Sequence, residues 1–188
     1  MASQKQMDLL LSGVPRWNTW RQSYPDVQAF EPDLHEADLH GVSLRGVDLR
    51  GSDLTGVNLQ DADLQDANLQ DADLRGANLR GANLSHTSFL RAKLGWADMR
   101  GAIFYHTNLK GSDLSYADLR EADLEGAILS KALFKQTDLS RVDLSRVDLY
   151  HVDLREADLE GAILSRNQEE NAQESEHVVT EDNVYKVQ

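Results

Sequence analysis

Leucine returns at every fifth position through most of the chain. Between residues 59 and 84 the sequence reads LQDADLQDANLQDADLRGANLRGANL. When each leucine is taken as the centre of a unit, the centres run from Leu34 to Leu164 as 27 five-residue units with no insertion or deletion. The centre is leucine in 23 units, and the other four centres are also large and apolar: Phe89, Met99, Phe104 and Phe134.

The positions around each centre are equally regular. The residue two before the centre is small (alanine, valine, serine, threonine or, once, Pro32), and the residue one before is mostly Asp or Asn. The two residues after the centre are mostly polar, and glycine is frequent at the second. We expect the Asp or Asn to hydrogen-bond the nearby backbone or to face solvent, because these side chains often bond backbone groups at turns.

A period of five residues excludes a single helix or a flat strand. On an α-helix five residues advance by about 500°, so successive leucines would be spread around the axis. On a flat strand an odd period sends alternate leucines to opposite faces. The chain must therefore turn within each unit. In one unit, Ala72 and Leu74 point inward, Asp73 points outward, and Arg75 and Gly76 turn the corner. The pattern predicts an all-β solenoid.

The repeat ADLXX or ANLXX resembles that of the pentapeptide-repeat family, and the resemblance extends from residue 32 to residue 166. It implies a right-handed quadrilateral parallel β-helix with four units in each coil, which gives about 6.75 coils for 27 units. The period alone indicates a solenoid, whereas the square cross-section and the handedness are implied by the resemblance.

In such a coil each centre lies above the centre twenty residues further on. We therefore expect columns of core side chains, one of which contains Leu64, Leu84, Phe104 and Leu124. Full burial of a side chain of this size contributes about 1.5–3 kcal/mol. The small residue two before each centre leaves room for the large one.

The residues before the repeat have no five-residue period. Within residues 1–31, Gly13 would end a first short helix and Pro15 suits the first turn of a second. Trp17 and Trp20 would share a face of that second helix. Because the end of a solenoid exposes an apolar cross-section, we predict a helical N-terminal cap with Trp17 or Trp20 on the leucines of the first coil.

The segment after the repeat, residues 167–188, contains six acidic residues against one lysine, and we expect it to be flexible. It contains no obvious plug for the end of the rod. Two alternatives would cover Ile163 and Leu164: the tail itself, or a second copy of the chain in a homodimer.

The composition argues against several classes of protein. The chain has no cysteine, so disulfides and thiolate metal sites are excluded. A formal net charge of -13 argues against direct binding of nucleic acid. Because the longest apolar runs are a few residues and no signal peptide is evident, we expect a cytoplasmic, bacterial protein without a membrane segment.

The residue pattern favours a protein that is not an enzyme and holds no cofactor. No nucleophile–base arrangement and no phosphate-binding loop appears. His86 and His106 lie twenty residues apart and would stack on neighbouring coils, but with no third ligand in either coil we expect no metal site. His35, His40 and His151 show no pattern of partners.

The middle repeats, SHTSFLRAKLGWADMRGAIFYHTN, depart most from the consensus. Trp96 and Tyr116 occupy the same corner position one coil apart and should stack, and we expect Tyr105 near them. Together with Arg91 and Arg100, these aromatic side chains suit a protein-binding patch. The alternative is scattered surface aromatics without a function. We interpret the chain as a rigid protein-interaction scaffold or inhibitor with an unknown protein partner.

An alternative function comes from the resemblance, because some pentapeptide-repeat proteins bind DNA gyrase as an acidic rod that mimics duplex DNA. Residues 33–166 contain 23 acidic and 15 basic residues, so the repeat is only moderately acidic. One face is expected to mix charges, with Arg80, Arg100 and Arg120 beside Asp98, Asp118 and Asp138. A uniformly negative section is expected only around Asp61, Asp63, Asp66, Asp71 and Asp73.

Overall fold

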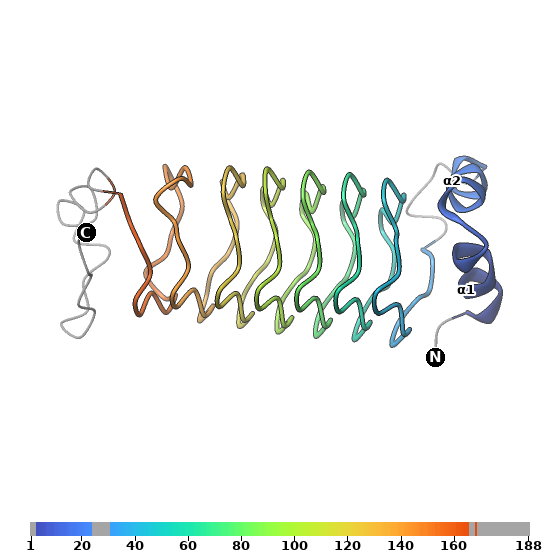
Figure 1. Cartoon of the computed structure of the whole chain (residues 1–188), viewed down its shortest axis with the longest axis horizontal. Helices are drawn as coiled ribbons and strands as arrows, with labels where there is room; N and C mark the ends of the chain where they lie inside the picture. The colour runs from blue at the N-terminus through green and yellow to red at the C-terminus, as the bar shows by residue number, and fades with distance from the viewer. Residues whose placement is uncertain (1–2, 24–30, 166–167, 169–188) are drawn as a thin grey trace.

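The computed structural model describes residues 3–23, 31–165 and 168 (Figure 1). In the repeat, the β-structure consists of single-residue bridges rather than extended strands. Each bridge is parallel and joins a residue to the one twenty positions further on, as Asp33 to Asp53 and Asp53 to Asp73. Twenty residues are four five-residue units, which is the number of units per coil that the resemblance implied.

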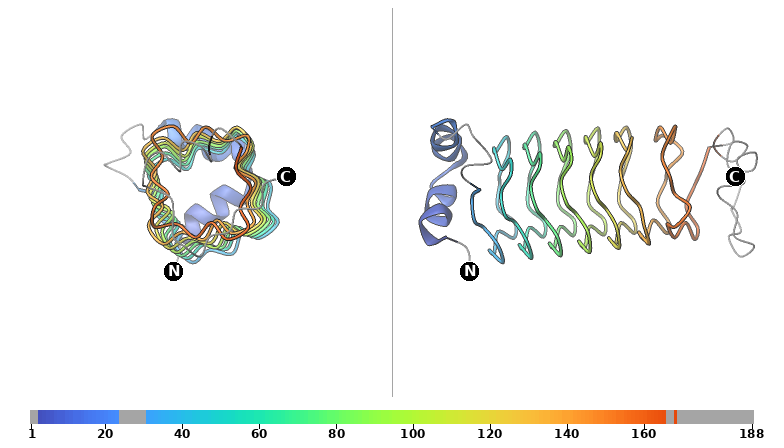
Figure 2. Two further views of the ribbon diagram at one scale, coloured as in Figure 1. Left: turned by 90° about the vertical axis from the view of Figure 1, so that its left-hand side faces the viewer. Right: turned by 180° about the vertical axis from the view of Figure 1, so that it is seen from behind.

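Each unit forms one side and one corner of a coil, and the end-on view is four-sided (Figure 2). At one corner the amide of Ala77 donates a hydrogen bond to the carbonyl of Leu74 at 3.0 Å, and Gly76 between them has a φ of 67°. A positive φ is required at the third residue of a type II turn. Glycine is frequent two residues after the centre because it adopts this conformation without steric cost.

The Asp or Asn before each centre accepts a local hydrogen bond. At all twenty of these positions the side-chain Oδ1 accepts the backbone N–H two residues later, at 2.9–3.4 Å. The predicted bond to nearby backbone is therefore present throughout the repeat. It holds the chain as it enters each corner, which explains why Asp and Asn dominate this position.

The centres fill the shaft of the rod. Leu64, Leu84, Phe104 and Leu124 are all buried, as the predicted core column requires. Two of the polar side chains that point inward have backbone partners: the hydroxyl groups of Thr87 and Thr107 donate to the carbonyls of Leu64 and Leu84 at 2.7 and 2.6 Å. A buried hydroxyl without such a partner would cost free energy.

Two helices lie across the first coil at one end of the rod, α1 (Gln4–Leu11) and α2 (Val14–Gln22) (Figure 1). Gly13 separates them, and proline stands in the first turn of α2. Trp17 is fully buried and its indole N–H donates to the carbonyl of Asp48 at 2.8 Å. Trp20 packs beside Trp17, with ring centroids 4.9 Å apart. Neither described helix is long and apolar enough to cross a membrane.

Side chains of the helices also bond the free backbone edge of the first coil. Asn18 donates to the carbonyl of Gly46 at 2.9 Å and accepts the amide of Asp48 at 2.9 Å. Gln6 of α1 accepts the amide of Asp33 at 2.8 Å. These groups would otherwise be an open ladder, which is a site for unwanted strand pairing.

The bridges are incomplete near the other end of the rod. Within the described repeat, no bridge joins residues 123 and 143 or residues 133 and 153, although both pairs follow the twenty-residue register. Figure 1 shows the orange coil standing apart from its yellow neighbour on one side. The coils therefore stack less regularly there than in the first half of the rod.

The last described contacts belong to Gln168, whose side-chain amide donates to the carbonyls of Leu144 and Val147 at 3.0 and 2.7 Å. Apart from Gln168, the tail lies outside the described residues. Its flexibility, and the choice between the tail and a second copy of the chain as the cover of Ile163 and Leu164, therefore stay predictions.

Candidate partner-binding surface

An exposed aromatic pair lies on one corner of the rod, which we call the Trp96 corner. The rings of Trp96 and Tyr116 are parallel, with centroids 5.2 Å apart, and the two side chains come from adjacent coils as predicted. Trp96 is 62% exposed and Tyr116 39% exposed. Both residues hold a positive φ, 59° and 63°, because each is the third residue of a corner turn. The turn thus directs both rings outward.

The face that follows the Trp96 corner carries a ladder of ion pairs. Arg100 donates two hydrogen bonds to Asp98, at 2.8 and 2.5 Å, and its Nε lies 3.4 Å from Asp118 on the next coil. Arg120 repeats this arrangement with Asp118 and Asp138. The hydrogen bond from Arg100 lowers the pKa of Asp98, although partial burial opposes the shift. The mixed face predicted from the sequence is therefore neutralised pair by pair.

The basic residues on the other side of the Trp96 corner are also paired. Lys93 lies 3.4 Å from Asp73, on the face that precedes this corner. Arg91 donates two hydrogen bonds to Asp71, at 2.8 and 2.7 Å, at the corner that precedes the Trp96 corner along the chain. The hydrogen bond to Asp71 raises the pKa of Arg91. The surroundings of the aromatic pair are thus polar, with charges of both signs.

Tyr105 does not belong to this surface. It lies two units, or half a coil, from Trp96, so the twenty-residue register places it on the diagonally opposite corner. There its ring contacts His86 and His106, with centroids 5.7 and 4.2 Å away. The prediction that Tyr105 lies near Trp96 and Tyr116 is therefore wrong, and the patch reduces to the Trp96 corner and its charged neighbours.

The section around residues 61–73 that was expected to be uniformly negative contains several ion pairs. Asp63 and Asp66 lie 3.7 and 3.6 Å from the guanidinium of Arg45. Asp71 pairs with Arg91, and Asp73 pairs with both Arg75 and Lys93. The expectation failed because it counted acidic residues along the chain, whereas most of their partners (Arg45, Arg91 and Lys93) come from the preceding or following coil.

A groove of about 630 Å³ runs along the edge of the ion-paired face. Its lining includes the basic Arg80, Arg100 and Arg120 and the acidic Asp138, Asp158 and Glu160. Sites for small molecules are mostly apolar. A groove lined by charges of both signs is better suited to side chains of a protein partner than to a small ligand.

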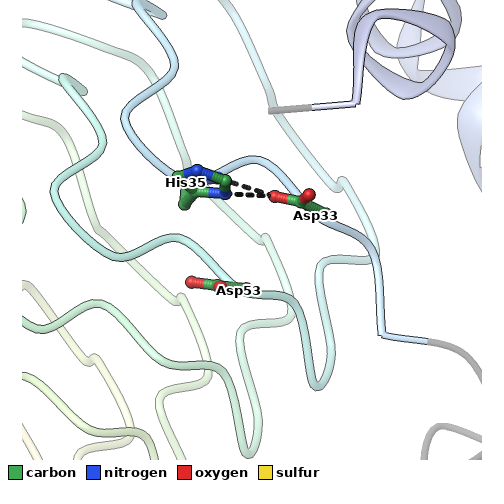
Figure 3. Close-up of side chains that lie close together, drawn as sticks. All are labelled: Asp33, His35 and Asp53. Carbon is green, nitrogen blue, oxygen red and sulfur yellow. Dashed lines mark hydrogen bonds and ion pairs between the residues drawn. The ribbon is translucent and has the colours of Figure 1, made fainter. Parts of the chain in front are cut away.

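One group of side chains could hold a metal ion. Asp33, His35 and Asp53 offer ligand atoms that all lie within 4.8 Å of one another (Figure 3). No other group of three such residues occurs in the described part of the chain. The group is not evident from the sequence, because Asp53 stands twenty residues from Asp33 and reaches His35 only through the stacking of one coil on the next. By contrast, His86 and His106 stack at 5.7 Å as predicted.

The fold and its repeat are those of a solenoid built from five-residue units. A model described as pentapeptide repeats matches residues 33–71, 67–104, 92–130 and 127–166, with eight copies. The chain therefore belongs to the pentapeptide-repeat family, and its fold is the right-handed quadrilateral β-helix of that family.

Solved structures of the same fold resemble the chain. Rfr23, a pentapeptide repeat protein from the cyanobacterium Cyanothece 51142, is 26% identical over 68% of this chain and 88% of its own, with a TM-score of 0.54. A pentapeptide repeat protein from the thylakoid lumen of Arabidopsis thaliana is 24% identical over 53% and 69%, with a TM-score of 0.52. The comparison with curated proteins gives no match.

A weaker likeness is to a solved structure of a fluoroquinolone resistance protein. QnrB1, a plasmid-mediated fluoroquinolone resistance protein, is 20% identical over 77% of this chain and 86% of its own, with a TM-score of 0.44. A likeness of this size carries no argument about function.

Proposed function

We propose that this protein is a rigid, non-enzymatic scaffold or inhibitor that binds a protein partner through the Trp96 corner. The observation that carries the proposal is the parallel, outward-facing pair of Trp96 and Tyr116. Aromatic side chains that are rigid and partly exposed are frequent anchors in protein interfaces. Here the two rings already stack on each other, so less conformational entropy is lost when a partner covers them.

The surroundings of the pair support a protein partner. Arg100 and Lys93 stand on the two faces that meet at the Trp96 corner, each in an ion pair with an aspartate. A central aromatic anchor with a polar, charged rim is the usual anatomy of a protein interface. The partner is therefore expected to present an apolar pocket with charged groups around it.

The proposal that the protein is not an enzyme is supported by the use of its carboxylates. All twenty Asp and Asn side chains before a centre serve as acceptors for the corner turns, and many also pair with arginine, as Asp73 does with Arg75. These groups recur because each coil needs them. Family membership supports the same conclusion, since pentapeptide repeats are structural repeats.

Two finer features of the architecture belong to the proposal. We take the rod to contain about 6.75 coils, four units each, from 27 units. We also take α1 and α2 to be a cap, supported by the burial of Trp17 and by the bonds of Asn18 and Gln6 to the edge of the first coil. A cytoplasmic location, a bacterial source and a homodimer through the C-terminal end of the rod remain predictions.

A paired substitution tests the binding surface. The variant with Trp96→Ala and Tyr116→Ala should melt at the temperature of the wild type, because neither ring is in the core. Its recovery of the partner from the native cell extract should fall by about tenfold or more, since interface aromatics are frequent hot spots. The matched control is Tyr105→Ala, which removes an exposed ring from the opposite corner. Equal recovery by the double variant and the control would contradict the proposal.

The alternative, a DNA mimic that binds DNA gyrase, has weaker support. The net charge of -13 favours it. The ion pairs of Arg45, Arg91, Arg100 and Arg120 oppose it, because they interrupt the negative stripe that a mimic requires. A supercoiling assay with purified gyrase separates the two. We expect no inhibition, and inhibition at low protein concentration would favour the mimic.

A further inference from the structure

We propose that Asp33, His35 and Asp53 form a binding site for one divalent transition-metal ion, such as Zn²⁺, which joins the first coil to the second. The three residues come from two positions of the repeat. Asp33 and Asp53 are bridge partners on adjacent coils, and His35 follows Asp33 by two residues. The site lies on the face that carries Asp73 and Lys93, two coils nearer the helices than Lys93, and it shares no residue with the Trp96 corner or the ion-paired face.

The geometry brings three ligand types together at one point. In Figure 3 the side chains of Asp33, His35 and Asp53 lie on the same side of the two coils. The Nδ1 of His35 is 2.5 Å from Asp33 Oδ1, and one ligand atom from each of the three residues lies within 4.8 Å of the others. The side chains of His35 and Asp33 are only 29% and 45% exposed, so they are partly held by their surroundings.

The donor set suits a transition-metal ion. Imidazole nitrogen and carboxylate oxygen are both common ligands of Zn²⁺, and imidazole is not a usual ligand of Mg²⁺ or Ca²⁺. Three protein ligands leave room for water to complete the coordination. A bound cation would also offset the repulsion between two carboxylates that the ladder stacks on adjacent coils.

The same chain contains a natural comparison at the next corner. Asp38 and His40 repeat the arrangement of Asp33 and His35, with His40 Nδ1 3.1 Å from Asp38 Oδ1. The residue stacked on Asp38 in the second coil is Asn58, whose amide donates a hydrogen bond to Asp38 Oδ1 at 2.9 Å. An amide donor occupies the carboxylate oxygen there, whereas Asp53 adds a second negative charge beside His35.

The location gives the ion a structural effect. The backbone of Asp33 is already bound to the N-terminal helical segment, since its carbonyl accepts the amide of Ser3 at 3.0 Å and its amide donates to Gln6. An ion held by Asp33 and Asp53 would therefore tie this segment, the first coil and the second coil together. Binding to the folded state alone raises stability by mass action.

Calorimetric titration of the full chain with Zn²⁺ tests the site. The wild type should bind one ion at this site, and Asp53→Asn should lower the affinity by about tenfold or more, since even the loss of an outer-shell partner of a metal ligand costs about 10–100-fold. Asp53→Asn should fold normally, because Asn occupies the same position at Asn58 and Asn78 and still accepts the turn hydrogen bond. The reverse change, Asn58→Asp, should create a second site with Asp38 and His40.

Controls separate this site from ions bound elsewhere. His86→Gln, which breaks the stacked histidine pair, should leave the high-affinity binding unchanged. Zn²⁺ should raise the Tm of the wild type but not that of Asp53→Asn. If Asp53→Asn failed to fold, His35→Gln would replace it in the same titration. Undiminished Zn²⁺ affinity in the Asp53 or His35 variant, or no added site in Asn58→Asp, would overturn the proposal.

Discussion

The coils between residues 36 and 81 and those between residues 121 and 161 share one sequence pattern but differ at their corners. In the early coils the third turn residue is glycine or aspartate at nine of ten corners, whereas in the late coils it is glycine at only two of nine. The late corners instead use Glu, Lys, Gln, Arg and His. A left-handed backbone costs an ordinary L-residue about 1–2 kcal/mol, but costs glycine nothing and is adopted more readily by aspartate.

Two corners of the late coils do not have the left-handed backbone conformation. Arg146 and Glu156 lack the positive φ found at every other described corner of the repeat. At the first of them the amide of Gly126 bonds the carbonyl of Arg146 at a long 3.5 Å, and at the second the amide of Gln136 bonds the carbonyl of Glu156. In each case the acceptor is one residue later than the register requires. The leucine period therefore determines what is inside, and the corner residue determines how closely one coil stacks on the next.

The first prediction concerns a charged substitution in the core of the early coils, which should destabilise the protein more than any other change considered below. Leu64→Asp places an unpaired charge at a fully buried centre, and we expect it to lower the free energy of unfolding by more than about 4 kcal/mol. The neighbouring coils should unfold with it, because each coil is stabilised only by those it contacts. Thermal melting followed by circular dichroism measures the loss.

The control for Leu64→Asp uses the same substitution on the surface of a late coil. Leu133 is 57% exposed and stands one before a centre, where most units have Asp or Asn. Leu133→Asp should leave the Tm unchanged or raise it slightly, because it restores the acceptor for the corner turn. A Tm for Leu64→Asp as high as that of Leu133→Asp would contradict the assignment of inside and outside.

The second prediction concerns the corners themselves. Gly76 has a φ of 67° and nothing within 4 Å of the position a Cβ would take, so Gly76→Ala adds backbone strain without a clash. We expect a loss of about 1–2 kcal/mol in the free energy of unfolding, measured by denaturant titration. In the late region Glu156→Gly should give a gain of about 0.5 kcal/mol, because the corner regains access to the left-handed conformation. If Glu156→Gly lost stability, or if Gly76→Ala lost none, corner strain would not distinguish the two regions.

Much of the fold was predictable because the repeat leaves few geometries. Each recurring position of the unit has one structural reason: leucine fills the core, the small residue leaves room for it, and Asp or Asn bonds the turn. The turn hydrogen bonds and the core column could therefore be predicted from the repeat. The failures arose where partners lie on neighbouring coils. Asp53 was not recognised beside His35, and Arg45 was not recognised beside Asp66, because these contacts depend on side-chain reach between coils. Tyr105 was misplaced because two units of sequence span half a coil.

The third prediction compares how often the backbone hydrogen bonds of the early and the late coils open. The amides of Leu124 and Phe134, which follow the two missing bridges, donate no backbone hydrogen bond to the next coil within the described repeat. In the early region Leu64 and Leu69 donate to the carbonyls of Asn83 and Ser88 at 2.8 and 2.7 Å. Hydrogen exchange followed by mass spectrometry should therefore be faster in late-coil peptides by about tenfold or more. Equal protection in both regions would mean that the missing bonds are replaced in solution.

The smallest expected effect concerns the ion-paired face between the two regions. Hydrogen bonds from Arg100 and Arg120 lower the pKa values of Asp98 and Asp118, against the opposing effect of partial burial. Because the pKa is lower in the folded than in the unfolded state, the resulting stability is complete above the unfolded value of about 3.9 and is lost as the pH falls through the folded value. The Tm should therefore be level from neutral pH to about pH 5 and fall below about pH 4.

Replacing the paired aspartates with asparagine tests whether these ion pairs contribute to the decrease in Tm at acid pH. Asp98→Asn with Asp118→Asn keeps both turn acceptors but removes the charges, so the Tm should drop by about 2 °C or less at neutral pH and depend less on pH below 4. Asp123→Asn is the matched control, since Asp123 accepts the amide of Glu125 but makes no ion pair among the described residues. If Asp123→Asn reduced the fall in Tm below about pH 4 as much as the double variant, the pH dependence would come from turn carboxylates in general. It would then not come from the ion pairs beside the Trp96 corner.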